Sequence, residues 1–252
     1  MDSRRDLGRQ NLTDETPALS VVVPVYNEGE NVVATLRGVV EHTRTRPLEV
    51  LVVYDFDEDT TVPVVQRMRS ELPELRLHKN TLGRGVLNAM KSGLRAARAQ
   101  YVIITMGDGS DNPADIDPMY TLAKDGADVV AGSRYMRGGR QIGGPLLKRT
   151  MSRTAGLSLH WLGGLPVHDA TSNFRLYSKR LLNQVTIESV GGFELGLELT
   201  VKAYRLRMRV AEVPTTWRDR TAGTSRFRLW QWLPRYLHWY TRGMVGRFKA
   251  NP

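Results

Sequence analysis

The chain has 252 residues, 41% of them hydrophobic, and carries a formal net charge of +10. This length suits one large domain with a sizeable core, and the absence of cysteine excludes a disulfide framework or a cysteine-ligated zinc site. The excess of positive charge favours anionic partners such as nucleotides, phosphorylated substrates, nucleic acid or acidic lipid.

The N-terminal part of the chain begins with a polar arm and continues as an alternation of strands and helices. Residues 1–17 are polar, and no run of about 18 apolar residues follows, so we expect neither a signal peptide nor a membrane span and predict a cytoplasmic protein. Short apolar runs predict strands at residues 19–28, 48–55, 75–79, 101–106 and 127–133, and helical spacing predicts helices at 28–43, 60–72 and 83–97. Continuous apolar strands that alternate with helices indicate an α/β fold, with a mostly parallel sheet and helices on both faces.

The regular alternation of predicted strands and helices ends after residue 134. Glycines at positions 138, 139, 143 and 144 predict a loop, followed by a helix at 146–162, a strand at 172–179, a helix at 193–207 and a strand at 209–217. We assign residues 18–226 to a single domain of Rossmann-like architecture. A basic loop, 218–227, leads into the C-terminal tail.

The tail, residues 227–252, is predicted to be an amphipathic helix. Its apolar residues recur at helical spacing: Leu229, Trp232, Leu233, Tyr236, Leu237, Tyr240 and Met244. Trp230 and Trp239 flank this stripe among arginines, and no acidic residue follows Asp219, which is typical of a helix at an anionic membrane interface. A helix packed on the domain of residues 18–226 explains the stripe equally well, and Pro234 should kink or restart it.

Acidic residues follow three of the predicted strands. They are Glu28 after the first strand, Asp55, Asp57 and Asp59 after the second, and Asp108 with Asp111 after the fourth. Any one of them is explained by a turn or a helix cap, but ligands of open α/β sheets bind at the carboxyl ends of the strands. Carboxylates there can bind ribose hydroxyls or a hard divalent cation, Mg²⁺ or Mn²⁺, which would neutralise a leaving diphosphate.

Basic residues gather around the glycine loop. They are Arg134, Arg137, Arg140, Lys148, Arg149 and Arg153. Solvated surface charge accounts for them about as well as a site does, although guanidinium groups are suited to phosphate oxygens.

Several motifs in chain order lead to a family. They run from Ser20 to Phe227: VVVPVYNE, YDFDEDTT, GRGVLNAMKSG, GDGSDNP, AGSRYMRGG, KRTMSR, HDATSNFRLYSK, GFELGLELTVKAYR and EVPTTWRDRTAGTSRF. With them the chain resembles family 2 glycosyltransferases of the GT-A fold, and within that family the polyprenyl-phosphate branch that includes dolichol-phosphate mannose synthases.

The resemblance implies roles for individual residues. The residues that would bind the nucleotide sugar, linked to GDP or UDP, are Pro24, Tyr26, Glu28, Asp55, Asp57 and Asp108. The metal ligands would be Asp108 and Asp111. The residues that would face the phosphate of the lipid acceptor or of the donor are Arg134, Arg137, Lys148, Arg149, Ser152, Arg218 and Arg226. Two departures matter: the usual DxD is one residue wider here, which leaves open which acid binds metal, and YDFDEDTT replaces DDxSxDGT, which puts the base and sugar in doubt.

The expected reaction is an inverting sugar transfer to a polyprenyl phosphate by an enzyme bound peripherally to the inner face of the membrane. An acceptor phosphate is already anionic, so positioning and charge stabilisation dominate, with Asp108, Asp111 and Arg134 as the central residues. Asp169 is the candidate base if the acceptor is instead a hydroxyl. A glycosyltransferase with a soluble acceptor is the alternative, and a nucleic-acid binder is disfavoured because it leaves the strand-end acids unexplained.

Overall fold

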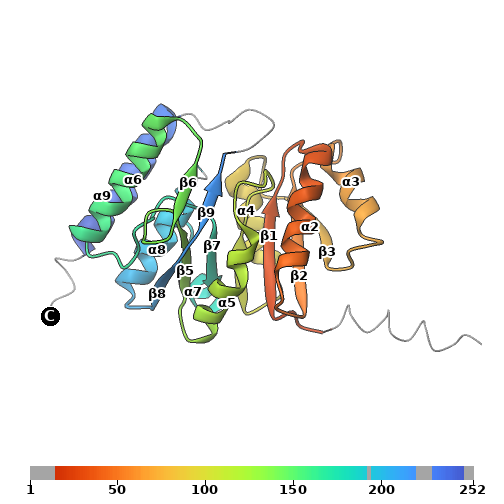
Figure 1. The fold of residues 1–252 in the computed structure, drawn as a ribbon, viewed down its shortest axis with the longest axis horizontal. Coiled ribbons are helices and arrows are strands. Elements are labelled where there is room, and N and C mark those ends of the chain that lie inside the picture. The colour runs from red at the N-terminus through yellow and green to blue at the C-terminus, as the bar shows by residue number, and fades with distance from the viewer. Residues whose placement is uncertain (1–14, 192–193, 220–228, 247–252) are drawn as a thin grey trace, which may run out of the picture.

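The computed structural model describes residues 15–191, 194–219 and 229–246, and their fold centres on a seven-stranded sheet (Figure 1). The strands are β1 (Leu19–Pro24), β2 (Leu48–Tyr54), β3 (Leu75–Lys79), β4 (Tyr101–Ile104), β5 (Val129–Ser133), β7 (Arg175–Ser178) and β8 (Val210–Pro214), in the order β3-β2-β1-β4-β7-β5-β8. β7 runs antiparallel to β4 and β5, and the other pairs are parallel. The mostly parallel sheet was predicted, but the direction of β7 was not.

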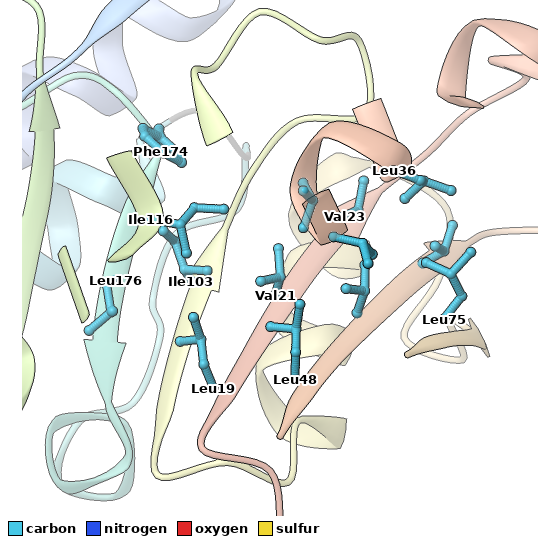
Figure 2. Close-up of a cluster of buried hydrophobic side chains, with 14 of the residues drawn as sticks. Leu19, Val21, Val23, Leu36, Leu48, Leu75, Ile103, Ile116, Phe174 and Leu176 are labelled. Carbon is cyan, nitrogen blue, oxygen red and sulfur yellow. The ribbon is translucent and has the colours of Figure 1, made fainter. Parts of the chain in front are cut away.

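Helices cover both faces of the sheet, as predicted. They are α2 (Val32–His42), α3 (Thr61–Met68), α4 (Val86–Ala96), α5 (Ile116–Lys124), α6 (Leu146–Trp161), α7 (Lys179–Gln184), α8 (Leu195–Arg205) and α9 (Leu229–Gly246), with short 3-10 turns at Gly29–Asn31 and Pro113–Asp115. Side chains alternate along β1, so Val21 and Val23 join the core under α2, α3 and α5 (Figure 2). Val22 joins the core under α4, α7 and α8 on the other face. Both faces of the central strands are therefore buried, which explains their continuous apolar sequence.

The glycine-rich segment 138–144 forms more than the predicted loop. It contains β6 (Arg140–Ile142), which pairs in parallel with β9 (Thr216–Arg218) in a separate two-stranded sheet. A Cβ at Gly139 would lie 2.3 Å from the carbonyl oxygen of Ser133, so only glycine lets the chain turn back against the end of β5. Beyond β9, Arg226 and the rest of the basic loop lie outside the described residues.

Helix α9 packs on the protein. Trp239 is 3% exposed in a third core with Leu159 of α6 and Val201 of α8, and Figure 1 shows α6 and α9 side by side. Tyr236, Tyr240 and Met244 pack against this core too, and the Tyr240 hydroxyl lies 2.9 Å from that of Ser158.

The stripe predicted for a membrane thus faces the protein wherever its side chains are described, apart from Leu237, which is 49% exposed. Pro234 lies inside α9, which continues to Gly246. Among the described helices, none is both long and apolar enough to cross a membrane.

Candidate active site

The residues predicted to bind the nucleotide sugar lie at the edge of the sheet where β1 and β2 have their carboxyl ends. Pro24 ends β1, and the ring of Tyr26 lies 5.5 Å from that of Phe56, just after β2. The backbone N–H of Glu28 donates to Thr61 Oγ1 at 3.0 Å, at the first residue of α3. Parallel pairing brings these segments together because both strands end at the same edge.

The three aspartates after β2 have different surroundings. Asp55 accepts hydrogen bonds from the Asn80 side chain and from the Gly85 N–H, each at 2.8 Å, which fixes it against the start of α4. Asp57 is exposed and pairs with Lys79 at 2.5 Å. Asp59 is buried, and its carboxylate accepts from the backbone N–H groups of Asn27 and Thr61, so it holds the β1 loop against α3.

The loop after β4 carries the predicted metal ligands. Asp111 accepts hydrogen bonds from the Met106 N–H at 3.0 Å and the Thr105 hydroxyl at 3.2 Å, whereas Asp108 accepts from the Ser110 N–H at 3.1 Å. Burial, together with the negative charge of Asp108, raises the pKa of Asp111 to about 7. The charge of Asp108 thus disfavours ionisation of Asp111, and a divalent cation would relieve this repulsion.

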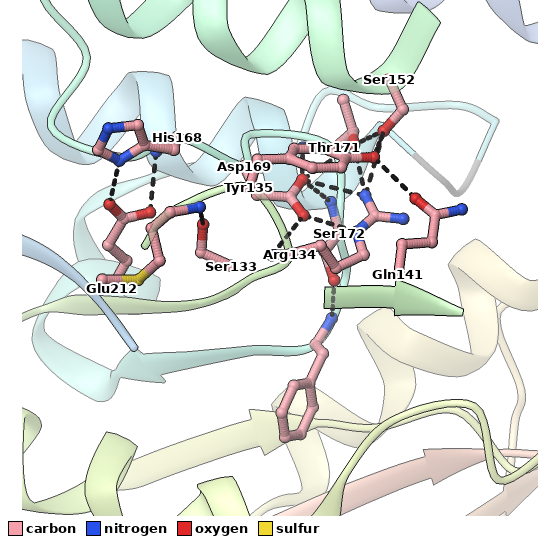
Figure 3. Close-up of polar contacts among 12 residues, drawn as sticks. Ser133, Arg134, Tyr135, Gln141, Ser152, His168, Asp169, Thr171, Ser172 and Glu212 are labelled. Atoms are coloured by element: carbon pink, nitrogen blue, oxygen red, sulfur yellow. Dashed lines mark hydrogen bonds and ion pairs between the residues drawn. The ribbon is translucent and has the colours of Figure 1, made fainter. Parts of the chain in front are cut away.

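Arg134 and Asp169 form a buried ion pair at the end of β5 (Figure 3). Arg134 Nε donates to Asp169 Oδ2 at 2.6 Å, and its Nη2 donates to Asp169 Oδ1 at 3.1 Å, to Thr171 Oγ1 at 2.9 Å and to Ser152 Oγ at 3.1 Å. The Tyr135 hydroxyl also donates to Ser152, at 2.8 Å. Although burial opposes ionisation, the Arg134 charge and its hydrogen bonds keep the pKa of Asp169 below its usual value.

A cavity of about 370 Å³ opens beside this ion pair. Its lining consists of Arg134, Tyr135, Met136, Gly139, Arg140, Gln141, Ile142, Arg149 and Arg153. The lining therefore contains four arginines, which come from the end of β5, from β6 and from α6. It contains no carboxylate. Such a pocket suits a phosphate-bearing ligand, because guanidinium groups bind phosphate oxygens with two hydrogen bonds at once.

The family model described as glycosyl transferase family 2 matches residues 20–186. The chain belongs to this family. It is 30% identical over 242 residues to the polyprenol monophosphomannose synthase of Mycolicibacterium smegmatis, across 91% of this chain and 89% of that protein. It is 26% identical to the dolichol-phosphate mannosyltransferase of Pyrococcus furiosus, across 83% of this chain but 59% of that protein.

Solved structures share the fold of this glycosyltransferase. One is the mannosyltransferase PcManGT from Pyrobaculum calidifontis in complex with GDP-Man and Mn²⁺, with a TM-score of 0.61 and 18% identity over 95% of this chain and 66% of that chain. Another is glucosyl-3-phosphoglycerate synthase from Mycobacterium tuberculosis in complex with Mn²⁺, UDP and glucosyl-3-phosphoglycerate, with a TM-score of 0.62 and 17% identity over 94% of this chain and 81% of that chain. At these identities the likeness concerns the fold, and it confirms the predicted GT-A class.

The structure separates the predicted acceptor residues of the glycosyltransferase into groups. Arg134 and Arg149 line the cavity, and Ser152 lies behind it as a hydrogen-bond partner. Arg137 is exposed, and neither it nor Lys148 is among the lining residues. The backbone N–H of Arg218 in β9 donates to the Ser110 carbonyl at 2.9 Å, which joins this strand to the loop of the predicted metal ligands.

Sequence reasoning missed several residues of this site. Tyr135 and Gln141 line the cavity, and Thr171 completes the contacts of Arg134. Gln141 had no signal in the sequence. Arg175, which lies outside the cavity lining but donates to the Asp169 carbonyl, had a signal: it is a charged residue between Phe174 and Leu176, two apolar residues of a predicted strand.

Asp169, the candidate base for a hydroxyl acceptor, is paired with Arg134 in the structure. A carboxylate with a lowered pKa, both oxygens of which accept hydrogen bonds from Arg134, is a weak general base. Its geometry is that of a residue that orients Arg134.

The residues present fit a divalent cation that also binds substrate. No group of three or more metal-binding side chains occurs in the described parts of the chain, so Asp108 and Asp111 do not form a closed protein site. Mg²⁺ is commonly bound by one or two carboxylates together with substrate phosphates, and this loop offers such a set.

Proposed function

We propose that this chain transfers a sugar, with inversion, from a nucleotide diphosphate sugar to a polyprenyl phosphate. The observation that carries the proposal is the arginine-lined cavity. Its strand β6 pairs with β9, and the N–H of Arg218 in β9 donates to the Ser110 carbonyl in the Asp108–Asp111 loop. Family membership supports the transfer of a sugar. The names of the two relatives, polyprenol monophosphomannose synthase and dolichol-phosphate mannosyltransferase, support the class of acceptor.

The acceptor side of the reaction needs positioning more than proton transfer. A phosphate monoester is an anion at neutral pH, so its oxygen can attack the anomeric carbon without a strong base. Arg134, Arg140, Arg149 and Arg153 hold that phosphate in the cavity and reduce its repulsion from the donor diphosphate. The weak basicity of Asp169 agrees with an acceptor that needs no deprotonation.

The residues proposed to bind the nucleotide sugar lie at the ends of the strands. Pro24, Tyr26, Glu28, Asp55 and Asp57 would hold the base and ribose of a GDP- or UDP-linked sugar. Asp108 and Asp111 would hold Mg²⁺ or Mn²⁺, which when bound supplies positive charge to the diphosphate as it leaves.

We also propose that α6 and α9 place this site at an anionic membrane surface. Exposed apolar residues lie at both ends of α6 and along α9: Leu146, Leu147, Trp161, Leu162, Leu237 and Val245. Neither helix contains an acidic residue, and Lys148, Arg149 and Arg153 lie on α6. Exposed apolar side chains among cations are typical of helices that lie in an anionic interface.

A transfer assay tests the reaction. GDP- and UDP-linked sugars are offered with Mg²⁺ or Mn²⁺ to a short-chain polyprenyl phosphate, to the same polyprenol without phosphate, and to phosphoglycerate as a soluble acceptor. We expect transfer to the polyprenyl phosphate alone, with the acceptor KM raised by Arg153→Ala and unchanged by Arg95→Ala, an exposed arginine in the last turn of α4. Transfer to phosphoglycerate instead would establish the soluble-acceptor alternative, and transfer to the unphosphorylated polyprenol would remove the role of the arginines.

A further inference from the structure

Arg175 is a buried cation that does not line the cavity. It lies on β7, the antiparallel strand between β4 and β5, and is 0% exposed. Its guanidinium donates from Nη2 to the Asp169 carbonyl at 2.7 Å, from Nε to the Ser172 carbonyl at 3.3 Å, and from Nη1 to the hydroxyl of Thr200 on α8. Burial lowers the pKa of Arg175, and removing a guanidinium from water is costly, so stability alone does not account for an arginine at this position.

The contacts of Arg175 lead to the cavity. Two of its donors fix the backbone of residues 169–172, and the side chain at the start of that segment, Asp169, binds the backbone and guanidinium of Arg134. Arg134 in turn lines the cavity. Arg175 and the cavity are thus joined through two intermediate contacts: Arg175 to the Asp169 backbone, and the Asp169 carboxylate to Arg134.

Helix α8 packs closely against the same segment of the backbone. The Gly196 N–H donates to Asn173 Oδ1 at 2.9 Å, and a Cβ at Gly196 would lie 2.6 Å from the Ser172 carbonyl oxygen, so only glycine permits this approach. Thr200, one turn later, donates to the Gly196 carbonyl at 2.7 Å while accepting from Arg175. Arg175 is therefore held from both sides, which suits it to set the position of the segment.

We propose that Arg175 is a positioning residue for the acceptor phosphate, acting through Asp169 on Arg134. The inference rests on the proposed function for the identity of the acceptor but not for the presence of an anion in the cavity. Lysine cannot replace Arg175, because one ammonium group cannot reproduce the planar set of donors that reaches both carbonyls and Thr200.

Two variants test the proposal, each with a matched control. Thr200→Val removes the hydroxyl that accepts from Arg175 and keeps the shape, while Thr200→Ser keeps the hydroxyl. Arg175→Lys keeps the charge, and its control is Tyr177→Phe, two residues along the same strand, where the buried hydroxyl has no hydrogen-bond partner in the described structure. Binding of inorganic phosphate and of nucleoside diphosphate with Mn²⁺ is measured by calorimetry, and KM and kcat are measured with polyprenyl phosphate.

We expect Thr200→Val and Arg175→Lys to weaken phosphate binding and raise the acceptor KM by roughly 2- to 30-fold, as for residues that act through another. Nucleotide affinity should stay at the wild-type value, and Thr200→Ser and Tyr177→Phe should match wild type. Unchanged phosphate affinity and acceptor KM in Thr200→Val overturn the proposal, and so does an equal loss of phosphate and nucleotide binding, which marks a structural role. If Arg175→Lys does not fold, Thr200→Val decides.

Failure of the proposed function gives a different result. A wild-type protein that binds inorganic phosphate but does not glycosylate polyprenyl phosphate contradicts the acceptor, and weaker phosphate binding by Thr200→Val then still supports the positioning role. A wild-type protein that binds neither inorganic phosphate nor polyprenyl phosphate overturns both.

Discussion

Asp108 and Asp111 lie three residues apart but are held differently. Asp111 is fixed to the end of β4 by the Met106 N–H and the Thr105 hydroxyl, whereas the Ser110 N–H binds Asp108 from within the turn. Gly109 makes this turn with φ +72°, a conformation that favours glycine. The turn therefore accommodates the extra residue between the two acids.

Asp108→Asn should abolish metal-dependent transfer and leave the fold intact, because an amide is a poorer ligand for a hard cation. Activity is measured over a range of Mn²⁺ concentrations, with circular dichroism to check folding. The control is Asp125→Asn, an exposed aspartate beyond the end of α5, which should behave as wild type. Wild-type rates for Asp108→Asn, or for the unmodified protein in excess chelator, would remove the metal role.

The Asp169–Arg134 ion pair should make the free energy of unfolding depend on pH. Because the pKa of Asp169 is lower in the folded protein than the unfolded value of about 3.9, its contribution to stability is complete above that value and is lost as the pH falls through the folded pKa. Asp169→Asn should cost about 3–5 kcal/mol at pH 7, since it leaves a buried guanidinium without its charge partner. This difference from wild type should shrink as the pH falls from the unfolded pKa through the folded pKa of Asp169, because the wild-type aspartate is then protonated too.

Urea unfolding at pH 7, 4 and 2.5 measures the effect. Asp57→Asn serves as the control because its pair with Lys79 is exposed and should contribute little. A free-energy difference between wild type and Asp169→Asn that is the same at all three pH values would show that the ion pair is not its source.

At the scale of elements, the two helices on the flank of the sheet carry tryptophans with opposite exposure. Trp239 on α9 is 3% exposed, with Lys202 and Arg242 4.9 and 5.0 Å from its ring centre, whereas Trp161 at the end of α6 is 68% exposed. On α9, Trp239 and the side chains packed beside it, Tyr236, Tyr240 and Met244, therefore contribute to the core, whereas Leu237 and Val245 are exposed. The large exposed apolar side chains at the two ends of α6 are the better candidates for contact with lipid.

We expect Trp161→Ser with Leu162→Ser to release the protein from anionic liposomes while keeping its melting temperature. Each large apolar side chain contributes about 1.5–3 kcal/mol on burial, so the pair should weaken binding by at least about tenfold. Trp239→Ser should instead lower the free energy of unfolding by about 3–5 kcal/mol, as when a core tryptophan is truncated. Sedimentation with liposomes and thermal melts distinguish these results.

The control for liposome binding is Val190→Ser, which removes an apolar side chain that is 74% exposed but lies on neither helix. Equal loss of binding in this variant would show that general surface hydrophobicity, and not α6, is responsible. Absence of wild-type binding to liposomes, or sedimentation with single-stranded DNA instead, would contradict the membrane proposal.

At the scale of the whole molecule, charges of opposite sign are sorted along one edge of the sheet. The acids follow β1, β2 and β4, whereas the arginines of the cavity follow β5 and lie on β6 and α6. A donor diphosphate with its cation and an anionic acceptor could thus bind side by side despite their like charges.

A nucleoside diphosphate at about 100 times its Kd should stabilise the protein by about 2.7 kcal/mol, which raises the melting temperature by roughly 5–10 °C for a chain of this size. The shift should require Mg²⁺ or Mn²⁺, disappear with chelator and be absent with the nucleoside alone. Comparison of GDP with UDP identifies the base. A full shift in the presence of chelator would contradict a cation between the diphosphate and the Asp108–Asp111 loop.

The sequence by itself determined the parallel strands, the covering helices and the grouping of acids at one edge. Continuous apolar runs such as 48–55 report burial on both faces, and parallel strands must end at the same edge, so Glu28, Asp55 and Asp108 could be brought together without coordinates. The glycines of 138–144 likewise predicted a loop, with the basic residues of 134–153 gathered around it.

Only the tertiary structure decided what each buried group touches. The periodicity of α9 requires an apolar environment but does not distinguish a bilayer from Leu159 and Val201, because both are equally apolar. Asp169 is the partner of Arg134 because β7 runs antiparallel between β4 and β5, so that the segment before β7, residues 169–174, lies at the carboxyl end of β5. Such a contact joins residues 35 positions apart, and a strand's own sequence does not specify its direction.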